Sequence, residues 1–249
     1  MIKRKNVPVS EQRLILLDAL AELGGVTELQ LLRFMVESDL MDYFTFKLEL
    51  SALEESDQVR QASSAQGTLL TITEEGRYVL SAFLRRVPAG RRDCVHEQAE
   101  RLRGAFRSEL ERQLDAFPLS EGRQGLRLRL LENDSALMDL SMSLETPQPE
   151  HLLRKRWFDH AQDIYGTITR CLSDGYTAGQ NEATLPPCVQ LHQTGDNEWF
   201  LALQDREKDP RMTLLLALPT RDMAAFYASR WPQNGEYIAD TVLRDLTED

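Results

Sequence analysis

QVRQASSAQGTLLTITEEG, residues 58–76, is the stretch that decides the fold of the first half of the chain. Two β-type runs, Gln58–Ala62 and Thr68–Ile72, flank the small polar turn 63–67, which predicts a hairpin. Thr73 follows at once, and its hydroxyl can cap a further helix that stops before Pro88. The stretch therefore predicts two antiparallel strands with a helix directly behind them.

Three helical patterns precede this hairpin. Thr27 and Gln30 form a capping box at the start of the second pattern. Thr45 can cap the third, in which Phe46 and Leu50 begin a buried stripe. Three helices, a hairpin and a fourth helix follow one another in a winged helix-turn-helix, so residues 10–86 predict that fold. In such domains the third helix usually lies in the DNA major groove and the hairpin touches the backbone.

This fold makes a DNA-binding transcriptional regulator the first functional expectation. The candidate DNA-contacting residues are Lys3, Arg4, Lys5, Tyr43, Thr45, Lys47, Ser51 and Arg60. With its stripe turned inward, however, the third helix directs Lys47, Leu48, Ser51 and Glu55 outward, which is a poor face for reading phosphates or bases. The wing tip also lacks Lys and Arg. A winged-helix protein-interaction module without specific DNA binding is therefore the alternative.

Several runs on this scaffold resemble a known family. ESDLMDYFT at Glu37–Thr45 and ITEEGR at Ile72–Arg77 are similar to a bacterial family of winged-helix proteins catalogued only as a domain of unknown function, DUF4364. Leu131–Asp134 and Trp157 also fit, so the resemblance covers about residues 1–173. It implies a winged helix followed by a small C-terminal domain, with transcriptional regulation as the usual assignment. The family supplies no catalytic residues.

Length and charge narrow the class of protein. The 249 residues predict two domains, or three small ones. The net charge of −11 divides into −5 over residues 1–84, +1 over 85–173 and −7 over 174–249, whereas a dedicated DNA binder usually carries a basic face. Basic residues gather only in short clusters such as Arg85-Arg86. Neither a membrane span of ~20 apolar residues nor a signal peptide is evident, so we expect a cytoplasmic protein without a membrane partner.

Patterns of catalytic or metal-binding residues are missing from the sequence. Cys94, Cys171 and Cys188 are widely spaced and indicate reduced thiols. The pair His160 and Asp163 supplies too few ligands for a metal. No glycine-rich phosphate loop or nucleophile elbow occurs. We therefore expect no enzyme activity, no metal and no cofactor.

The second half contains an internal repeat. Residues 126–172, placed over 200–246 with a constant offset of 74, share ten of 47 positions, among them Arg156/Arg230 and Trp157/Trp231. Each copy has the pattern strand, turn, strand, helix, which predicts two duplicated β-β-α units and an α+β fold class. Two such units can pair their sheets edge to edge, a pairing that a second subunit would supply to a chain with one copy.

Two details of the repeat carry further expectations. Pro232 lies in the middle of the last predicted helix and predicts a kink or break at Trp231. Val189–His192 can add a strand before the second copy. Trp157 and Trp231, with Tyr165 and Tyr237, could line a pocket for a small-molecule effector, although aromatic residues at helical spacing are more often core.

A long helical pattern from Gly90 to Phe117 joins the two halves. Its apolar line, which we expect to form the interface of a homodimer, comprises Val95, Leu102, Phe106 and Leu110, with Leu114 continuing it. A linker helix docked on its own chain is the equally open alternative. The expected organisation is a winged-helix domain at 1–88, a connecting helix at 89–118 and a duplicated α+β domain at 119–249.

Overall fold

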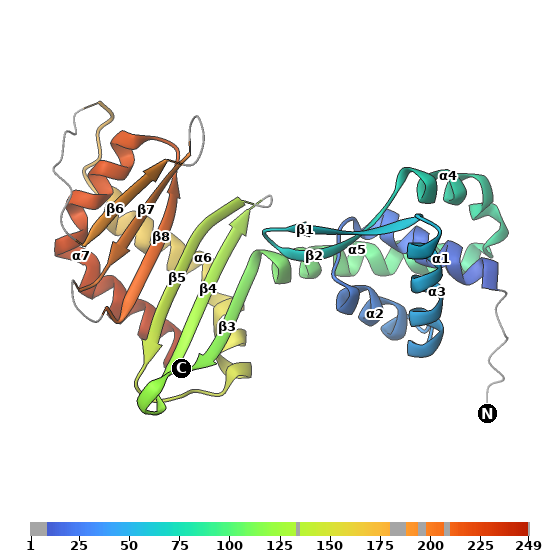
Figure 1. Ribbon diagram of the computed structural model, residues 1–249, viewed down its shortest axis with the longest axis horizontal. Coiled ribbons are helices and arrows are strands. Elements are labelled where there is room, and N and C mark those ends of the chain that lie inside the picture. The colour runs from blue at the N-terminus through green and yellow to red at the C-terminus, as the bar shows by residue number, and fades with distance from the viewer. Residues whose placement is uncertain (1–8, 133–134, 180–187, 194–197, 207–209, 249) are drawn as a thin grey trace. The chain divides into compact units, whose positions relative to one another are not determined.

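The computed structural model describes residues 9–132, 135–179, 188–193, 198–206 and 210–248 (Figure 1). The chain forms two compact units, divided in sequence between Leu110 and Glu111. Both combine helices with antiparallel strands, so the fold is α+β as predicted. The connecting helix expected at 89–118 is not a region of its own, because the helix that forms, α5 (Ala89–Glu111), belongs to the first unit except for its last residue.

The first unit contains the predicted order of helices and strands. Its elements are α1 (Val9–Leu23), α2 (Glu28–Glu37), α3 (Tyr43–Glu55), β1 (Val59–Ser64), β2 (Gly67–Ile72), α4 (Glu74–Phe83), a 3-10 turn (Leu84–Arg86) and α5 (Ala89–Glu111). The two strands pair antiparallel from Val59 opposite Ile72 to Ser64 opposite Gly67. The hairpin turn is therefore shorter than the polar stretch suggested.

Local capping signals fix where the helices begin. The predicted capping box is confirmed. The backbone amide of Gln30 donates to Thr27 Oγ1 at 3.2 Å, and the backbone amide of Thr27 donates to Gln30 Oε1 at 3.1 Å. Thr73 caps α4 as predicted. The prediction for α3 is wrong, because Asp42 is the cap and accepts from the Thr45 amide at 3.0 Å. The carboxylate lies one turn earlier and is the stronger acceptor, so Thr45 lies inside the helix.

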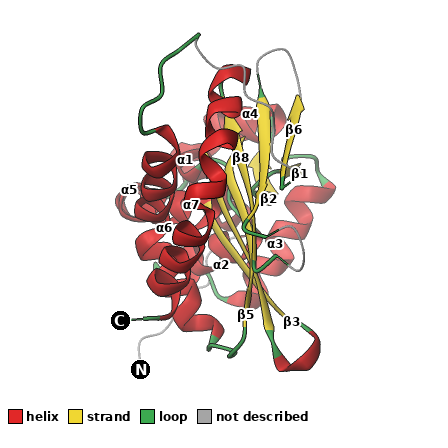
Figure 2. Cartoon of the chain, turned by 90° about the vertical axis from the view of Figure 1, so that its left-hand side faces the viewer, coloured by secondary structure: helices red, strands yellow, loops and turns green. Residues whose placement is uncertain are grey.

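The second unit is a six-stranded antiparallel sheet in the order β3-β4-β5-β8-β7-β6. Its elements are β3 (Arg112–Pro118), β4 (Gln124–Glu132), β5 (Ser135–Leu144), α6 (Glu150–Ser173), β6 (Val189–Gln193), β7 (Trp199–Gln204), β8 (Met212–Leu218) and α7 (Arg221–Thr247), with a 3-10 turn at Ser120–Gly122. Figures 1 and 2 show α6 and α7 on the same side of the strands. The strand expected near Val189 is present as β6.

Residues 112–118, which we predicted as the end of the connecting helix, form β3 instead. Leu114 lies opposite Leu128 of β4, and Ala116 lies opposite Leu126. A spacing of four residues between Leu110 and Leu114 fits a helix, but it also fits a strand with one buried face. Pairing with β4 satisfies the backbone of β3 and places Leu114 in the core under the helices.

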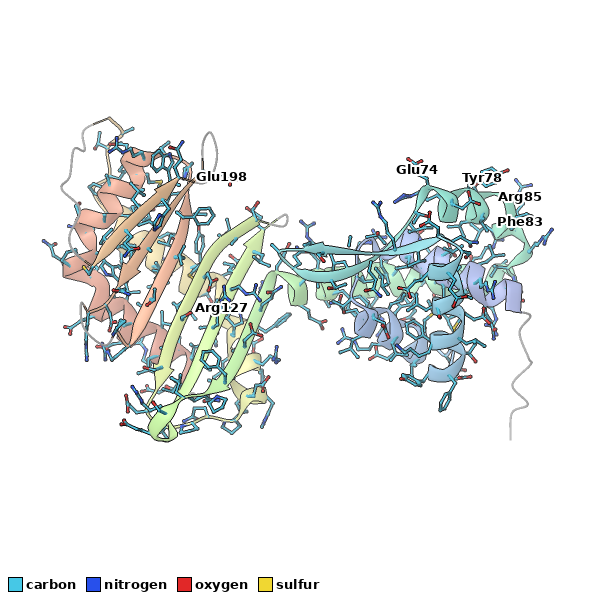
Figure 3. The ribbon with its side chains drawn as sticks, in the orientation of Figure 1. Glu74, Tyr78, Phe83, Arg85, Arg127 and Glu198 are labelled. Carbon is cyan, nitrogen blue, oxygen red and sulfur yellow. The ribbon has the colours of Figure 1, made fainter. Side chains whose placement is uncertain are left out.

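The two faces of the sheet differ in polarity. Alternate strand residues such as Leu128, Leu140 and Leu214 are fully buried in the core that α6 and α7 cover. On the opposite face Arg127 projects from β4 (Figure 3). Its guanidinium contacts both carboxylate oxygens of Asp139, with Nη2 at 2.6 Å from Oδ2. In β4 and β5 the side chains thus alternate between a buried apolar face and a polar face, as half-buried strands do.

Of the kink or break expected at Trp231, the break is wrong, because α7 runs continuously through Pro232. Buried residues lie on both sides of the proline, among them Tyr227 before it and Ile238 and Val242 after it. Burying several large apolar side chains on the far side of the proline offsets the ~3 kcal/mol that a proline costs inside a helix. Tertiary packing thus overrides the local preference.

Trp157 and Trp231 are both buried, at 0% and 1% exposure, as expected of core residues. They differ in their indole nitrogens. Trp231 Nε1 donates to the Gln204 carbonyl at 2.6 Å, whereas the buried Trp157 Nε1 has no hydrogen-bond partner among the described residues. The Trp231 indole therefore contributes a hydrogen bond that the Trp157 indole does not.

We predict that Trp231→Phe lowers the free energy of unfolding by about 1 kcal/mol more than Trp157→Phe. Phenylalanine removes the donor to Gln204 at position 231, whereas at position 157 it removes a buried N–H that is unpaired. Equilibrium urea unfolding followed by far-ultraviolet circular dichroism measures both variants. Equal losses, or a larger loss at position 157, would contradict the expectation.

Candidate functional site

α3 has one side in the core of the first unit and the other in solvent. Phe46, Leu50 and Leu53 are buried as predicted, and Glu49 beside them is 1% exposed. Arg13 of α1 donates through Nε to Glu49 Oε2 at 2.7 Å, which keeps this buried carboxylate paired. The apolar stripe and the ion pair together determine which side of α3 faces outward.

The outward side of α3 is largely apolar. Phe44 is 82% exposed, Leu48 69% and Tyr43 50%. Phe44 and Leu48 lie one helical turn apart and are therefore neighbours on the surface, and the rings of Tyr43 and Phe44 meet edge to face at 5.5 Å. We call Tyr43, Phe44 and Leu48 the α3 ridge. Adjoining exposed apolar side chains of this kind mark interaction surfaces.

Lys47, a candidate DNA contact on the same side of α3, is paired within the unit. Its ammonium donates a short hydrogen bond to a carboxylate oxygen of Glu28, the first residue of α2. This hydrogen bond is the main cause of a raised pKa of Lys47. An exposed pair of this kind adds little stability. Its effect at the site is that the positive charge of Lys47 is offset locally.

The segment around α3 is acidic. Residues 28–60 contain eight Asp and Glu against three Lys and Arg, a net charge of −5. The exposed acids in this segment are Glu37, Asp39, Asp42, Glu55 and Asp57. Such a surface repels a phosphate backbone and favours apolar or cationic partners.

The remaining candidate DNA contacts do not add a basic face. The amide and hydroxyl of Thr45 both donate to the Asp42 carboxylate, at 3.0 and 3.1 Å. Arg60 is exposed on β1, and Ser51 is exposed on α3 beyond the ridge. Lys3, Arg4 and Lys5 lie outside the described residues. The structure thus gathers Tyr43, Lys47 and Ser51 on one side of α3, beside apolar groups that we had not assigned a role.

A second exposed patch lies on α4 and the 3-10 turn after it. Tyr78 is 68% exposed and Phe83 38%, and the guanidinium of Arg86 stacks 4.5 Å above the Phe83 ring. Arg77 and Arg85 are also exposed, and Tyr78, Phe83 and Arg85 project at this end of the unit (Figure 3). Arg85-Arg86 stood out in the sequence as a basic cluster, but the aromatic rings beside it did not. The mixture of arginines and rings in α4 was the signal that could have identified this patch.

The apolar line that we expected at a dimer interface is buried in the first unit. Val95 and Phe106 are 0% and 1% exposed, Leu102 packs against the same core, and Leu110 is buried. Gln30 of α2 donates to the Phe106 carbonyl at 3.0 Å, which fastens α5 to the unit. Val95, Phe106 and Leu110 are therefore not accessible to a second copy while the unit is folded, and Leu102 is only partly exposed. The alternative, a helix docked on its own chain, describes α5, and the homodimer itself stays a prediction.

A cluster of ionisable groups lies between α1 and α5. Asp18 is only 9% exposed, and burial, reinforced by Glu22, raises its pKa from 3.8 to about 6. Arg92 and His96 of α5 act in the opposite direction. Glu22 Oε2 lies 3.1 Å from Nη2 of Arg103 and 3.5 Å from Nδ1 of His96. Folding of the first unit is therefore linked to the protonation of Asp18.

Within the described ranges, no three His, Cys, Asp or Glu side chains are grouped to hold a metal. No helix in those ranges combines the length and the apolar character needed to cross a membrane. A shallow cavity of about 330 Å³ is lined by Phe117, Leu119 and Arg123 among others. Trp157 and Trp231, which we considered as pocket residues, lie instead in the core.

Comparisons with known proteins give one match. The family model described as a domain of unknown function, DUF4364, matches residues 12–172, which is more than half of the chain. No curated protein and no solved structure matches the chain. The matched range contains the α3 ridge and ends within α6.

We predict that Asp18→Asn stabilises the protein by on the order of 1 kcal/mol at pH 7.5 and gives no gain at pH 4. The folded state holds the Asp18 proton more tightly than the unfolded chain, so stability falls as pH rises through the interval from about 4 to about 6. Asparagine removes this loss. Thermal unfolding measured at both pH values, with exposed Asp93→Asn as control, checks it, and a gain that is independent of pH would refute it.

Proposed function

The chain belongs to the DUF4364 family, and from this premise we propose that it is a non-enzymatic winged-helix protein whose α3 ridge binds another protein. A DNA-binding regulator was our first expectation from the sequence. The chemistry of α3 favours the alternative, a protein-interaction module on the same scaffold.

Assignment as a winged helix rests on the order and pairing of the elements. Three helices lead into the β1–β2 hairpin, and α4 follows directly. Val26, between α1 and α2, forms an isolated antiparallel bridge with Leu70 of β2. The hairpin is thereby attached to the helical part of the unit, as a wing requires.

The observation that carries the proposed function is the composition of the outward side of α3. Phe44 and Leu48 are the most exposed large apolar side chains on α3, and Lys47 beside them is paired with Glu28. Exposing apolar groups to water costs free energy, about 25 cal/mol for each Å². A partner that covers the ridge recovers this free energy, whereas a phosphate backbone does not.

The surroundings of the ridge define the chemistry of the partner. Glu37, Asp42 and Glu55 are exposed carboxylates on α2, at the α3 cap and at the end of α3. A protein surface with an apolar centre and a basic rim would complement this arrangement. We therefore propose such a surface as the ligand of the α3 ridge.

DNA binding is the second candidate function, and the patch on α4 favours it. Arg77, Arg85 and Arg86 are exposed and could contact phosphates without reading sequence. Recognition of a palindromic site would also need a homodimer, formed through a surface other than the buried line of α5. A cytoplasmic location fits either candidate.

We also propose that the second unit contains two copies of one structural unit. At an offset of 74, every buried residue of α6 matches a buried residue of α7; the positions are Leu153/Tyr227, Trp157/Trp231, Ala161/Gly235, Ile164/Ile238, Ile168/Val242 and Leu172/Leu246. The buried residues of β5 match those of β8 at the same offset, from Met138/Met212 to Leu144/Leu218. Shared burial at every such position supports a duplication.

The outer strands refine the alignment of the copies. Leu114 lies opposite Leu128 on β3 and β4, and Val189 lies opposite Leu203 on β6 and β7, an offset of 75 in both strands. The constant offset of 74 is therefore wrong for the first strand of each copy. The difference coincides with a bulge at which the pairing of β5 passes over Leu137. Each copy is thus proposed as a β-β-β-α unit, with β3 and β6 as additional strands.

We predict that a photo-crosslinking amino acid at position 44 gives a discrete protein adduct in the native cell, and that Leu48→Asp abolishes this adduct. The charge would desolvate poorly against the apolar centre of a partner. A crosslinker at exposed Tyr78 serves as the control. Adducts of equal yield at positions 44 and 78 would contradict a specific α3 ridge, and an adduct of two copies of this chain would assign the ridge to self-assembly.

We predict that the purified protein binds random-sequence duplex DNA weakly and without requiring Lys47. Fluorescence anisotropy over a range of salt concentrations measures this affinity, because each phosphate contact adds about 0.9 to the logarithmic salt slope. A steep slope that falls by about three after replacement of Arg77, Arg85 and Arg86 by Ala would establish the second candidate. If Lys47→Ala removed a preference for particular DNA sequences, the proposal that α3 binds protein and not DNA would be overturned.

A further inference from the structure

The β5–β8 pairing joins the two halves of the second unit in a symmetric register. The paired residues on the buried face are Met138–Leu216, Leu140–Leu214 and Met142–Met212. Leu214 is the counterpart of Leu140 under the offset of 74, and the other two pairs exchange when each residue is replaced by its counterpart. Each strand therefore meets its own equivalent around Leu140 and Leu214, as two subunits do across a two-fold axis.

We call the β5–β8 pairing the seam. The helices that cover the seam also contact each other. α6 from the first half packs against α7 from the second half. Arg156 of α6 donates through Nη1 to the Leu246 carbonyl near the end of α7 at 3.2 Å. The contact between the halves therefore has a ladder of backbone hydrogen bonds and a shared apolar core, which are the components of a subunit interface.

Each half would leave apolar side chains exposed and backbone groups without hydrogen-bond partners if the other half were absent. Met138, Leu140 and Met142 are buried in the assembled sheet, and without β8 the β5 backbone groups on that side would lack partners. An edge strand with a long apolar face needs to be covered or paired. The match to the family model ends at residue 172, within the last turn of α6, so it contains only one of the proposed copies.

We propose that the β5 edge is a homotypic assembly surface, which accepts a second copy of the β-β-β-α unit centred on Leu140, and that β6 to α7 of this chain fill it in place of a separate subunit. This inference rests on the proposed duplication and is independent of what the α3 ridge binds. The register supports this occupant, because β8, whose burial pattern matches that of β5, places Leu216, Leu214 and Met212 opposite Met138, Leu140 and Met142.

The first step of the test is cleavage of the folded full chain at a protease site inserted after Gly179. We expect the two fragments to remain together as one particle with the 28.5 kDa mass of the intact chain, apart from the inserted site. A disulfide between S141C and T213C, which are paired residues, should form in the intact chain and not between S141C and L215C. Separation of the fragments, or crosslinking without regard to register, overturns the seam.

The second step asks whether the N-terminal fragment pairs with itself. In a symmetric pair, residue 139 of one copy faces residue 141 of the other. Two versions of the N-terminal fragment are prepared, one carrying D139C and the other S141C, both with Cys94 and Cys171 replaced by Ala. When mild urea lets the fragments exchange partners, the two versions should form disulfide-linked dimers with each other. D139C with S143C is the mismatched control and should not. Addition of excess C-terminal fragment should compete and abolish the dimer.

The two steps separate the possible failures. An intact seam with no self-paired fragment, either after refolding of the isolated fragment or after exchange within the cleaved particle, overturns the homotypic surface and leaves the duplication standing. Loss of the correct register in the intact chain overturns both. Photo-crosslinking at the α3 ridge is unaffected by either result.

Discussion

The second unit depends on one constraint, which is that β5 cannot remain an edge. Its buried face is a row of apolar side chains around Leu140, and β8 supplies the only strand paired on that side in the described sheet. Once β5 and β8 pair, α6 and α7 are brought over one continuous apolar surface, and β3 and β6 become the outer strands. Those outer strands, of seven residues in β3 and five in β6, are the edges that remain.

A comparable constraint sets the chemistry of the first unit. The inward stripe of α3 and the Arg13–Glu49 pair fix the rotation of the helix, so Phe44 and Leu48 face solvent. The fold therefore selects the side of α3 that faces solvent. The same helix with a different outward side could bind DNA, which is why the scaffold by itself does not decide the function.

Features set by local sequence were predictable, and those set by distant contacts were not. The caps at Thr27 and Thr73 depend on neighbours three residues away and were identified correctly. β3 was mistaken for helix because its partner, β4, determines its conformation. A kink or break was expected at Trp231 because the sequence around Pro232 does not reveal how much apolar surface α7 buries on both sides of the proline. At the candidate site the outward position of Lys47 followed from helical spacing, but its pairing with Glu28 joins two helices and had no signal in the sequence.

Closing the sheet within one chain also changes valency. Two single-copy chains sharing such a sheet would bring two N-terminal units to one assembly, whereas this chain brings one. Its sheet is complete at any dilution, since the two halves are covalently tethered and their effective concentration does not depend on that of the protein. If the chain acts as a single copy, a ligand of its N-terminal unit is held by one contact, without avidity, and exchanges at the rate that this contact allows.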